Sequence, residues 1–87
     1  MKKFELPAIC EQEKSFYGKA FVTEKDNGDI ELTSYETVVC RIHKGKFQRL
    51  YDGYSMTTMR HINAFIRFYG LQGGGKSWWE KLEVVKM

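Results

Sequence analysis

The sequence contains no apolar run of about 18 residues, the length that a membrane-spanning helix requires. Lys2 and Lys3 open the chain, but Glu5 and Pro7 interrupt it before any apolar stretch begins. A secretory signal would need such a stretch directly after its basic residues. We therefore expect no membrane partner and a cytoplasmic location.

Cysteine and histidine are too scarce to favour a metal site. Zinc ligands normally come in close pairs, whereas Cys40 and His43 form one mixed pair that only the distant Cys10 and His61 could complete. Cysteines of cytoplasmic proteins are normally reduced, which also argues against a disulfide. We expect no metal and no cofactor.

The excess of positive over negative charge is also small. The formal net charge is +3, whereas a protein that coats DNA usually carries a denser basic stripe. Aromatic residues are plentiful, at 15% of 87 residues, and disordered chains are poor in them. A chain of this length suits one domain, and we expect residues 1–87 to form it.

Short alternating segments predict antiparallel strands in the first half of the chain. We expect residues 1–14 to form an edge strand or an ordered arm, and residues 15–25 to form a strand. Asn27-Gly28 then predicts a hairpin turn, because both residues tolerate a positive φ. The chain returns through a second strand at residues 30–35.

The next hairpin can be assigned a register. Residues 37–43 and 46–51 form its strands, and the two-residue turn Lys44-Gly45 joins them, which fixes the side chains that share a face. The predicted core face carries Val38, Cys40, Ile42, Phe47 and Tyr51. The predicted outer face is basic and carries Thr37, Arg41, His43, Lys46 and Gln48.

Apolar residues at helical spacing predict one main helix over residues 57–69. A hydroxyl from Ser55, Thr57 or Thr58 can cap its first turn by accepting from a free backbone N–H group. The side chains expected to face the sheet are Met59, Ile62, Phe65, Ile66 and Tyr69. Those expected on the opposite, solvent-exposed face of the helix are Arg60, Asn63 and Arg67.

The main helix is expected to end in a Schellman motif at Gly70 and Leu71. Ser77, followed three residues later by Glu80, predicts a capping box and a last short helix. Strands followed by helices predict an α+β fold. In this fold an antiparallel sheet of about four strands packs on the main helix, with the short C-terminal helix beside it.

A nucleotide-binding pattern is present, but its context argues against that chemistry. Residues 70–77 satisfy the phosphate-loop pattern G-x-x-x-x-G-K-[ST]. That loop works where it leaves a buried strand and opens a helix, so that backbone N–H groups cradle a phosphate. Here the pattern follows the predicted main helix. We interpret the segment as a helix end, a glycine linker and a new helix start.

No set of residues can be assembled into a catalytic site. A Cys–His nucleophile pair needs a third, orienting group and an oxyanion donor. The spacing of the cysteines and histidines indicates neither. We therefore expect no catalytic residue and a protein that is not an enzyme.

Basic and aromatic side chains are the candidates for binding a partner. Basic residues contact phosphates, and aromatic residues and arginine are enriched at protein interfaces. Solvation and core packing account for the same residues just as simply. Two adjacent tryptophans cannot face the same way, so we expect one of them to pack inward. The candidates are Arg41, His43, Lys46, Arg60, Arg67, Tyr54, Trp78 and Trp79.

The start of the main helix carries a recognisable string of residues, S-x-T-T-x-x-H-I-N-x-F. Its polar members are Ser55, Thr57, Thr58, His61 and Asn63. With the preceding hairpin, this string resembles a family of small uncharacterised proteins from bacteriophages, plasmids and other mobile elements, over residues 34–82. The resemblance implies no activity. The polar cluster is either a recognition surface or a capping network, and we favour capping, because one hydroxyl cap contributes roughly 1 kcal/mol.

These observations predict a binding function. We expect a small non-enzymatic protein of a phage or mobile element that acts stoichiometrically on a host protein or nucleoprotein complex. An antagonist of a defence system, such as an anti-CRISPR protein, is one example. The alternative is an accessory protein that binds DNA or RNA through the basic sheet face. The sequence does not predict the oligomeric state.

Overall fold

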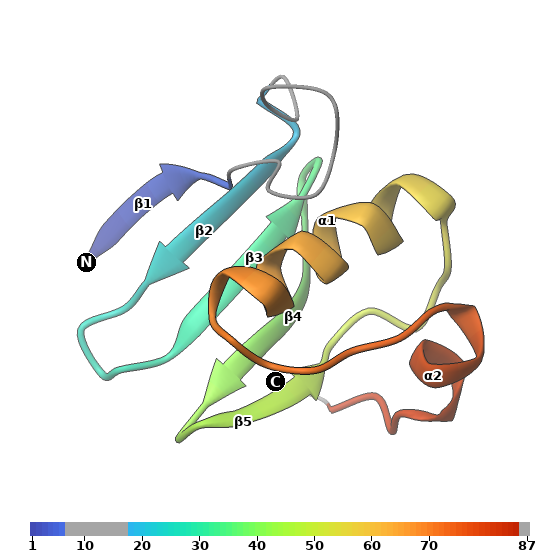
Figure 1. Ribbon diagram of the computed structural model, residues 1–87. Helices are drawn as coiled ribbons and strands as arrows, with labels where there is room; N and C mark the ends of the chain where they lie inside the picture. Colours follow the sequence, from blue (N-terminus) through green and yellow to red (C-terminus); the bar gives the residue numbers. More distant parts are fainter. Residues whose placement is uncertain (7–17, 86–87) are drawn as a thin grey trace.

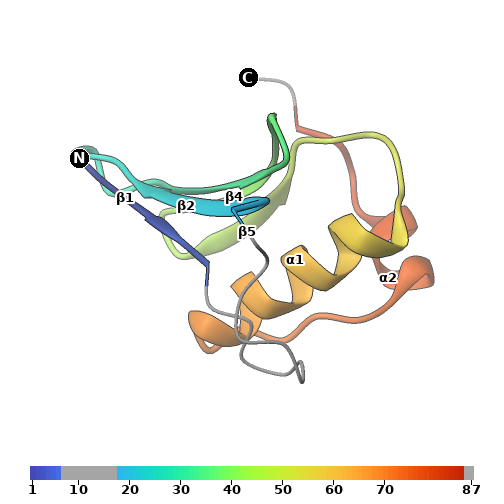
Figure 2. The same ribbon diagram turned by 90° about the horizontal axis from the view of Figure 1, so that it is seen from above.

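The computed structural model describes residues 1–6 and 18–85 and shows an antiparallel sheet with two helices on one side (Figures 1 and 2). The five strands follow one another across the sheet in chain order. The strands are β1 (Lys2–Glu5), β2 (Ala20–Glu24), β3 (Ile30–Ser34), β4 (Thr37–His43) and β5 (Lys46–Arg49). The α+β prediction is confirmed, with five strands rather than about four.

The fifth strand is β1, which pairs antiparallel with β2 and confirms an edge strand at residues 2–5. Residues 7–14 of the predicted arm, which include Cys10, lie outside the described residues, as do residues 15–17 of the strand predicted over residues 15–25. Gly18 and Lys19 are described but precede β2, which begins at Ala20. Gly28 adopts a φ of 93° in the predicted turn between β2 and β3. The amide of Asp29 donates to the side chain of Asn27 at 3.0 Å, which stabilises that turn.

The predicted register of the β4–β5 hairpin is confirmed. Cys40 lies opposite Arg49 and His43 lies opposite Lys46. Lys44 and Gly45 both take a positive φ, 52° and 79°, as the twist of a two-residue hairpin turn requires. The register follows from this turn, because a two-residue connection leaves one pairing for all residues behind it.

The predicted core face of β4 is wrong at Val38, because the strand contains a bulge. Leu32 pairs with Cys40 but Thr33 pairs with Val38, so Val39 is an extra residue without a partner on β3. An extra residue reverses the alternation of side chains beyond it. Val39 is consequently 1% exposed, and Val38 is only half-buried.

The main helix, α1 (Met56–Phe68), is one residue displaced from its prediction, and its two ends form as expected. Ser55 caps the start, since the amide of Thr58 donates to its Oγ at 3.2 Å. At the end, the Leu71 amide donates to the Ile66 carbonyl at 2.9 Å and Gly70 adopts a φ of 73°. These contacts define a Schellman motif.

The second helix, α2 (Lys76–Lys81), begins earlier than the capping box predicted. Gly75 is its N-cap and makes no side-chain hydrogen bond, so Ser77 lies inside the first turn. Trp79 is 1% exposed and its Nε1–H donates to the Gly53 carbonyl at 2.8 Å. Burial of an indole contributes about 4–6 kcal/mol against about 1 kcal/mol for a cap, so Trp79 anchors α2 without the predicted capping box.

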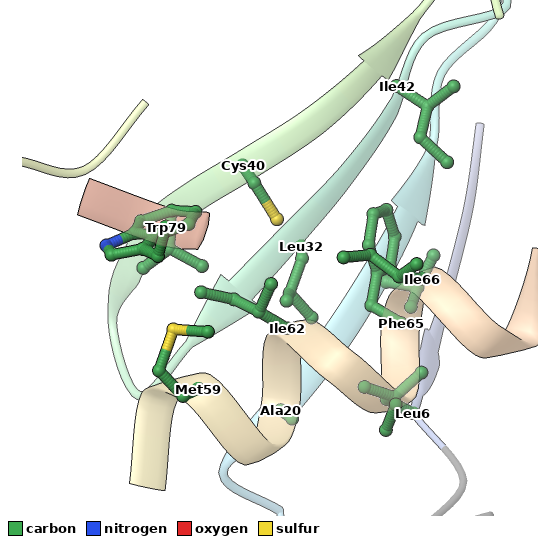
Figure 3. Close-up of a cluster of buried hydrophobic side chains, with 13 residues drawn as sticks. Leu6, Ala20, Leu32, Cys40, Ile42, Met59, Ile62, Phe65, Ile66 and Trp79 are labelled. Atoms are coloured by element: carbon green, nitrogen blue, oxygen red, sulfur yellow. The ribbon is translucent and has the colours of Figure 1, made fainter. Parts of the chain in front are cut away.

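The core lies between the sheet and the two helices (Figure 3). The predicted inward face of α1 is confirmed, because Ile62 and Phe65 are 0% exposed and Met59 is 5% exposed. Strands β2, β3 and β4 contribute the other side of this core, and α2 contributes Trp79. The buried strand residues that Figure 3 labels are Ala20, Leu32, Cys40 and Ile42.

A buried arginine joins the sheet to α2, and its role was not foreseen from the sequence. Arg49 lies on the inner face of β5 and is 7% exposed. Its guanidinium donates to the carbonyl oxygens of Tyr51 at 2.8 Å, Asp52 at 3.0 Å, Trp79 at 2.9 Å and Leu82 at 3.1 Å. It also lies 4.6 Å from the centroid of the Trp79 ring. One side chain thus ties together β5, the following loop and the end of α2.

Among the residues that the structure describes, no helix is long and apolar enough to cross a membrane.

Candidate interaction surfaces

The structure divides the eight candidate residues among three environments. One group lies on the outer face of the sheet, a second lines a groove beside α1, and the third lies on α2. The first group is Arg41, His43 and Lys46, the second is Tyr54, Arg60 and Arg67, and the third is Trp78 and Trp79.

The two tryptophans differ in burial, as expected for neighbours on a short helix. Trp79 is a core residue, so it cannot contact a partner in this conformation. Trp78 is half-buried and lies 5.5 Å from the ring of Phe47, measured between centroids. Trp78 therefore covers the edge of the core at β5, with part of its ring in solvent.

A groove of about 740 Å³ lies between the outer side of α1 and segment 71–75, which we call the α1 groove. Segment 71–75 runs back alongside α1 on its way to α2 (Figures 1 and 2). Tyr54 and Met56 line the groove at the start of α1, with exposed fractions of 39% and 72%. Exposed side chains of this size and kind are typical of surfaces that bind other proteins.

Glycines allow segment 71–75 to pass this close to the helices. A Cβ atom on Gly73 would lie 2.8 Å from Cδ1 of Ile66, and one on Gly74 would lie 2.7 Å from Cβ of Trp78. A Cβ on Gly75, by contrast, would meet no atom within 4 Å. The phosphate-loop pattern thus follows a helix and packs against it, which agrees with the interpretation as a linker.

The charged side chains that line the described part of the α1 groove are Arg60 and Arg67. Both are solvent-exposed, and both make at least one interaction within the chain. Near the mouth of the groove, the ammonium group of Lys76 lies 5.2 Å from the centroid of the Tyr54 ring. Among its described lining residues there is no aspartate or glutamate, so this surface carries positive charge.

The outer face of the sheet has mixed charge, which corrects the prediction of a basic face. His43 Nδ1 donates to Asp29 Oδ1 at 2.6 Å, and this hydrogen bond lowers the pKa of the Asp29 carboxyl. Glu31, opposite Arg41 in the register, is 6% exposed, and its Oε2 lies 2.8 Å from Nζ of Lys25. That contact is an ion pair without the directional geometry of a hydrogen bond.

The acidic residues of this face cannot be recognised from the β4–β5 hairpin alone. Asp29 and Glu31 belong to the neighbouring strand and its turn, and the sheet brings them beside Arg41 and His43. Arg41 also donates through Nε to Gln48 Oε1 at 2.6 Å. The basic groups of the outer face are therefore largely paired within the sheet.

The polar string at the start of α1 forms a capping and packing network, as favoured from the sequence. His61 is 1% exposed, and its Nδ1 lies 2.7 Å from Oγ of Ser34 on β3. The hydroxyl of Thr58 lies 3.3 Å from the same oxygen. Burial lowers the pKa of His61, and the nearby charge of Lys19 adds to this shift. Asn63, by contrast, lines the α1 groove.

The buried thiol of Cys40 has no access to solvent. It is 0% exposed, and burial raises its pKa well above the ordinary value, so it stays protonated near neutral pH. Within the described ranges, no three histidine, cysteine or acidic side chains come together in a group that could hold a metal ion.

The fold and the surfaces define a small two-layer α+β domain with an exposed groove. A family of unknown function (DUF8033) matches residues 4–81, and the chain therefore belongs to this family. The match includes the last two residues of β1 and all of β2, which precede the residues of the resemblance described above. No curated protein and no solved structure matches the chain.

Proposed function

We propose that this protein is a small non-enzymatic binding protein that acts stoichiometrically on a host protein or nucleoprotein complex. The α1 groove is its main contact surface in this proposal. The observation that carries the proposal is the groove itself, which presents Tyr54 and Met56 to solvent beside two arginines. Tyrosine, methionine and arginine are the residue types that interfaces favour.

The placement of the reactive groups supports a binding role over a catalytic one. Cys40 and His61 are buried among core and capping residues. His43 is held by Asp29 on the outer face of the sheet, whereas its neighbour Ile42 points to the core face on which α1 packs. A catalytic site would need a nucleophile or base that a substrate can reach, together with groups that orient it.

The resemblance to proteins of phages and other mobile elements supports a target in the host cell. An antagonist of a host defence complex is the example that we favour. A domain of this size is large enough for an interface of standard dimensions, about 800 Å² on each partner.

Binding of DNA or RNA through the outer sheet face is the alternative, and the structure gives it less support. Arg41, His43 and Lys46 do lie on one face, but Asp29 and Glu31 share it. Carboxylates beside phosphate-binding cations weaken the electrostatic attraction on which nucleic-acid binding depends.

The proposal can be tested by affinity capture of the tagged protein from host lysate, with and without nuclease. Two variants are compared with the wild type. Met56→Asp alters the groove and suits the first turn of a helix, where negative charge is favourable. Lys46→Asp makes a charge change on the exposed end of the outer face.

We expect a host protein to be retained after nuclease treatment, in a fixed ratio to the bait. Met56→Asp is expected to lose it and Lys46→Asp to keep it. Retention that depends on intact nucleic acid, or that survives Met56→Asp and fails in Lys46→Asp, would refute the proposal and favour the outer face.

A further inference from the structure

The charge and shape of the α1 groove indicate the chemistry of the segment that it binds. On the basis of the function proposed above, we propose that the groove takes an extended, acidic segment of the partner protein. In this arrangement an apolar side chain of the segment packs on Tyr54 and Met56, and its carboxylates reach Arg60 and Arg67.

The positive charge of the groove comes from its lining. Arg60 and Arg67 are exposed along one side of it, and the described lining residues include no carboxylate. Each arginine already makes a contact within the chain. A carboxylate of the bound segment therefore adds to or replaces that contact. Arginine can bind such a carboxylate with two parallel N–H donors.

The spacing of the arginines sets the spacing of the acids. Arg60 and Arg67 are seven residues apart on α1, which corresponds to about 10 Å along the helix axis. An extended peptide in the polyproline II conformation rises about 3.1 Å per residue with three residues per turn, so residues i and i+3 lie on the same side about 9 Å apart. The preferred segment consequently has acidic residues at positions i and i+3, with the apolar residue on the side of Tyr54 and Met56.

The opposite wall of the groove suits a peptide backbone. Segment 72–75 offers the side-chain amide of Gln72 and the backbone of three successive glycines, and Asn63 projects into the groove from α1. Side-chain amides both donate and accept hydrogen bonds, as a peptide backbone requires. A Cβ on Gly75 would meet open space, so the backbone there can be approached from the solvent side.

A nucleic acid fits the groove less well than an acidic peptide. Single-stranded nucleic acid is held by a row of cations that follows its backbone and by aromatic rings on which its bases stack. The groove offers two arginines, one half-exposed tyrosine and an exposed methionine. Methionine at this position favours an apolar side chain over a base.

The experiment selects ligands from a display library of random twelve-residue peptides, using the full-length protein as bait. The enriched peptides are then synthesised with a fluorescent label and titrated by fluorescence anisotropy. The test variant is Arg60→Glu/Arg67→Glu. The matched control, Lys44→Glu/Lys46→Glu, makes the same change in net charge at the exposed β4–β5 turn. A single-stranded oligonucleotide of equal charge is titrated in parallel.

We expect the enriched peptides to carry two acids three residues apart beside a large apolar residue. Their affinity should fall by about tenfold or more in Arg60→Glu/Arg67→Glu and stay within about twofold in the control, since attraction between opposite charges becomes repulsion at the first site alone. Peptides with lysine in place of the acidic residues should bind Arg60→Glu/Arg67→Glu more tightly than they bind the wild type. In NMR spectra of the wild type, the amide signals of Gly73, Gly74 and Gly75 should shift on titration.

Three results would overturn the proposal. They are enrichment of peptides without net negative charge, equal loss of affinity in both double variants, and tighter binding of the oligonucleotide than of any peptide. If one of these results occurs but the wild type still captures a host protein that Met56→Asp loses, the groove binds a protein segment of different chemistry and the proposed function stands. If the wild type also captures no host protein through the groove, both proposals are wrong.

Discussion

Replacing Arg49 by methionine tests whether one buried side chain holds α2 against the sheet. The substitution keeps an unbranched apolar stem and removes all five N–H donors of the guanidinium. The carbonyl oxygens of Tyr51, Asp52, Trp79 and Leu82 would each lose a donor. The contact between the guanidinium and the Trp79 ring would be lost as well.

The expected cost follows from the burial of these groups. A hydrogen bond from a charged donor contributes about 1.5–3 kcal/mol, but the four bonds share one side chain and are not additive. Part of the loss is recovered where water can reach the carbonyls. We expect the free energy of unfolding to fall by about 3–5 kcal/mol, against a total of about 5–15 kcal/mol for a typical domain.

Urea denaturation followed by tryptophan fluorescence and circular dichroism measures this loss. Arg41→Met is the matched control, because Arg41 lies on the opposite face of the sheet, where its Nε donates to the side chain of Gln48. The control should lose about 1 kcal/mol or less. If the two variants are equally stable, Arg49 does not hold α2 in place and the reasoning is refuted.

Three further outcomes are expected. Gly74→Ala should lower the free energy of unfolding by about 1–3 kcal/mol, because its Cβ would meet the side chain of Trp78. Gly75→Ala, the control, should cost less than about 1 kcal/mol. Thermal denaturation measures both, and equal effects would contradict the packing of segment 71–75. The pKa of His61 lies below its ordinary value of 6.5 in the folded protein, so the unfolded state binds more protons and stability should fall as pH drops below about 6.5. This dependence should be shallower in His61→Gln, and an unchanged slope would show that His61 is not the group responsible. In a Cys10→Ser background, Cys40 should react with a thiol reagent only as fast as the protein unfolds, and rapid labelling under native conditions would contradict its burial.

The features that the sequence predicted well depend on neighbouring residues. The turn Lys44-Gly45 determined the β4–β5 register, because a two-residue connection allows one pairing. Ser55 and Gly70 marked the ends of α1 through hydrogen bonds that span at most five residues. Helical spacing alone placed Ile62 and Phe65 in the core.

The features that were missed depend on packing between distant segments. The bulge at Val39 arises where β4 pairs with β3, and the residue types in β4 do not predict it. The start of α2 at Lys76 is not marked by the hydroxyl of Ser77, and the helix is anchored by the distant contacts of Trp79 instead. The register already placed Arg49 opposite Cys40, but its carbonyl partners on α2 lie about thirty residues further along the chain.

The candidate surface was predicted in part. Helical spacing puts Arg60 and Arg67 on one outer face of α1, and this face was predicted correctly. The return of segment 71–75 along the helix, which converts that face into a groove, could not be predicted, since it depends on the fit of Gly73 and Gly74 against Ile66 and Trp78.

Site-specific photo-crosslinking in host cells tests the central claim, that the α1 groove binds a protein partner. A benzophenone amino acid replaces Met56 at the groove in one version of the protein and Lys46 on the outer sheet face in another. We expect one crosslinked host protein from position 56, in a one-to-one product, and none from position 46. Crosslinks to protein from position 46 alone, or to nucleic acid alone, would contradict it.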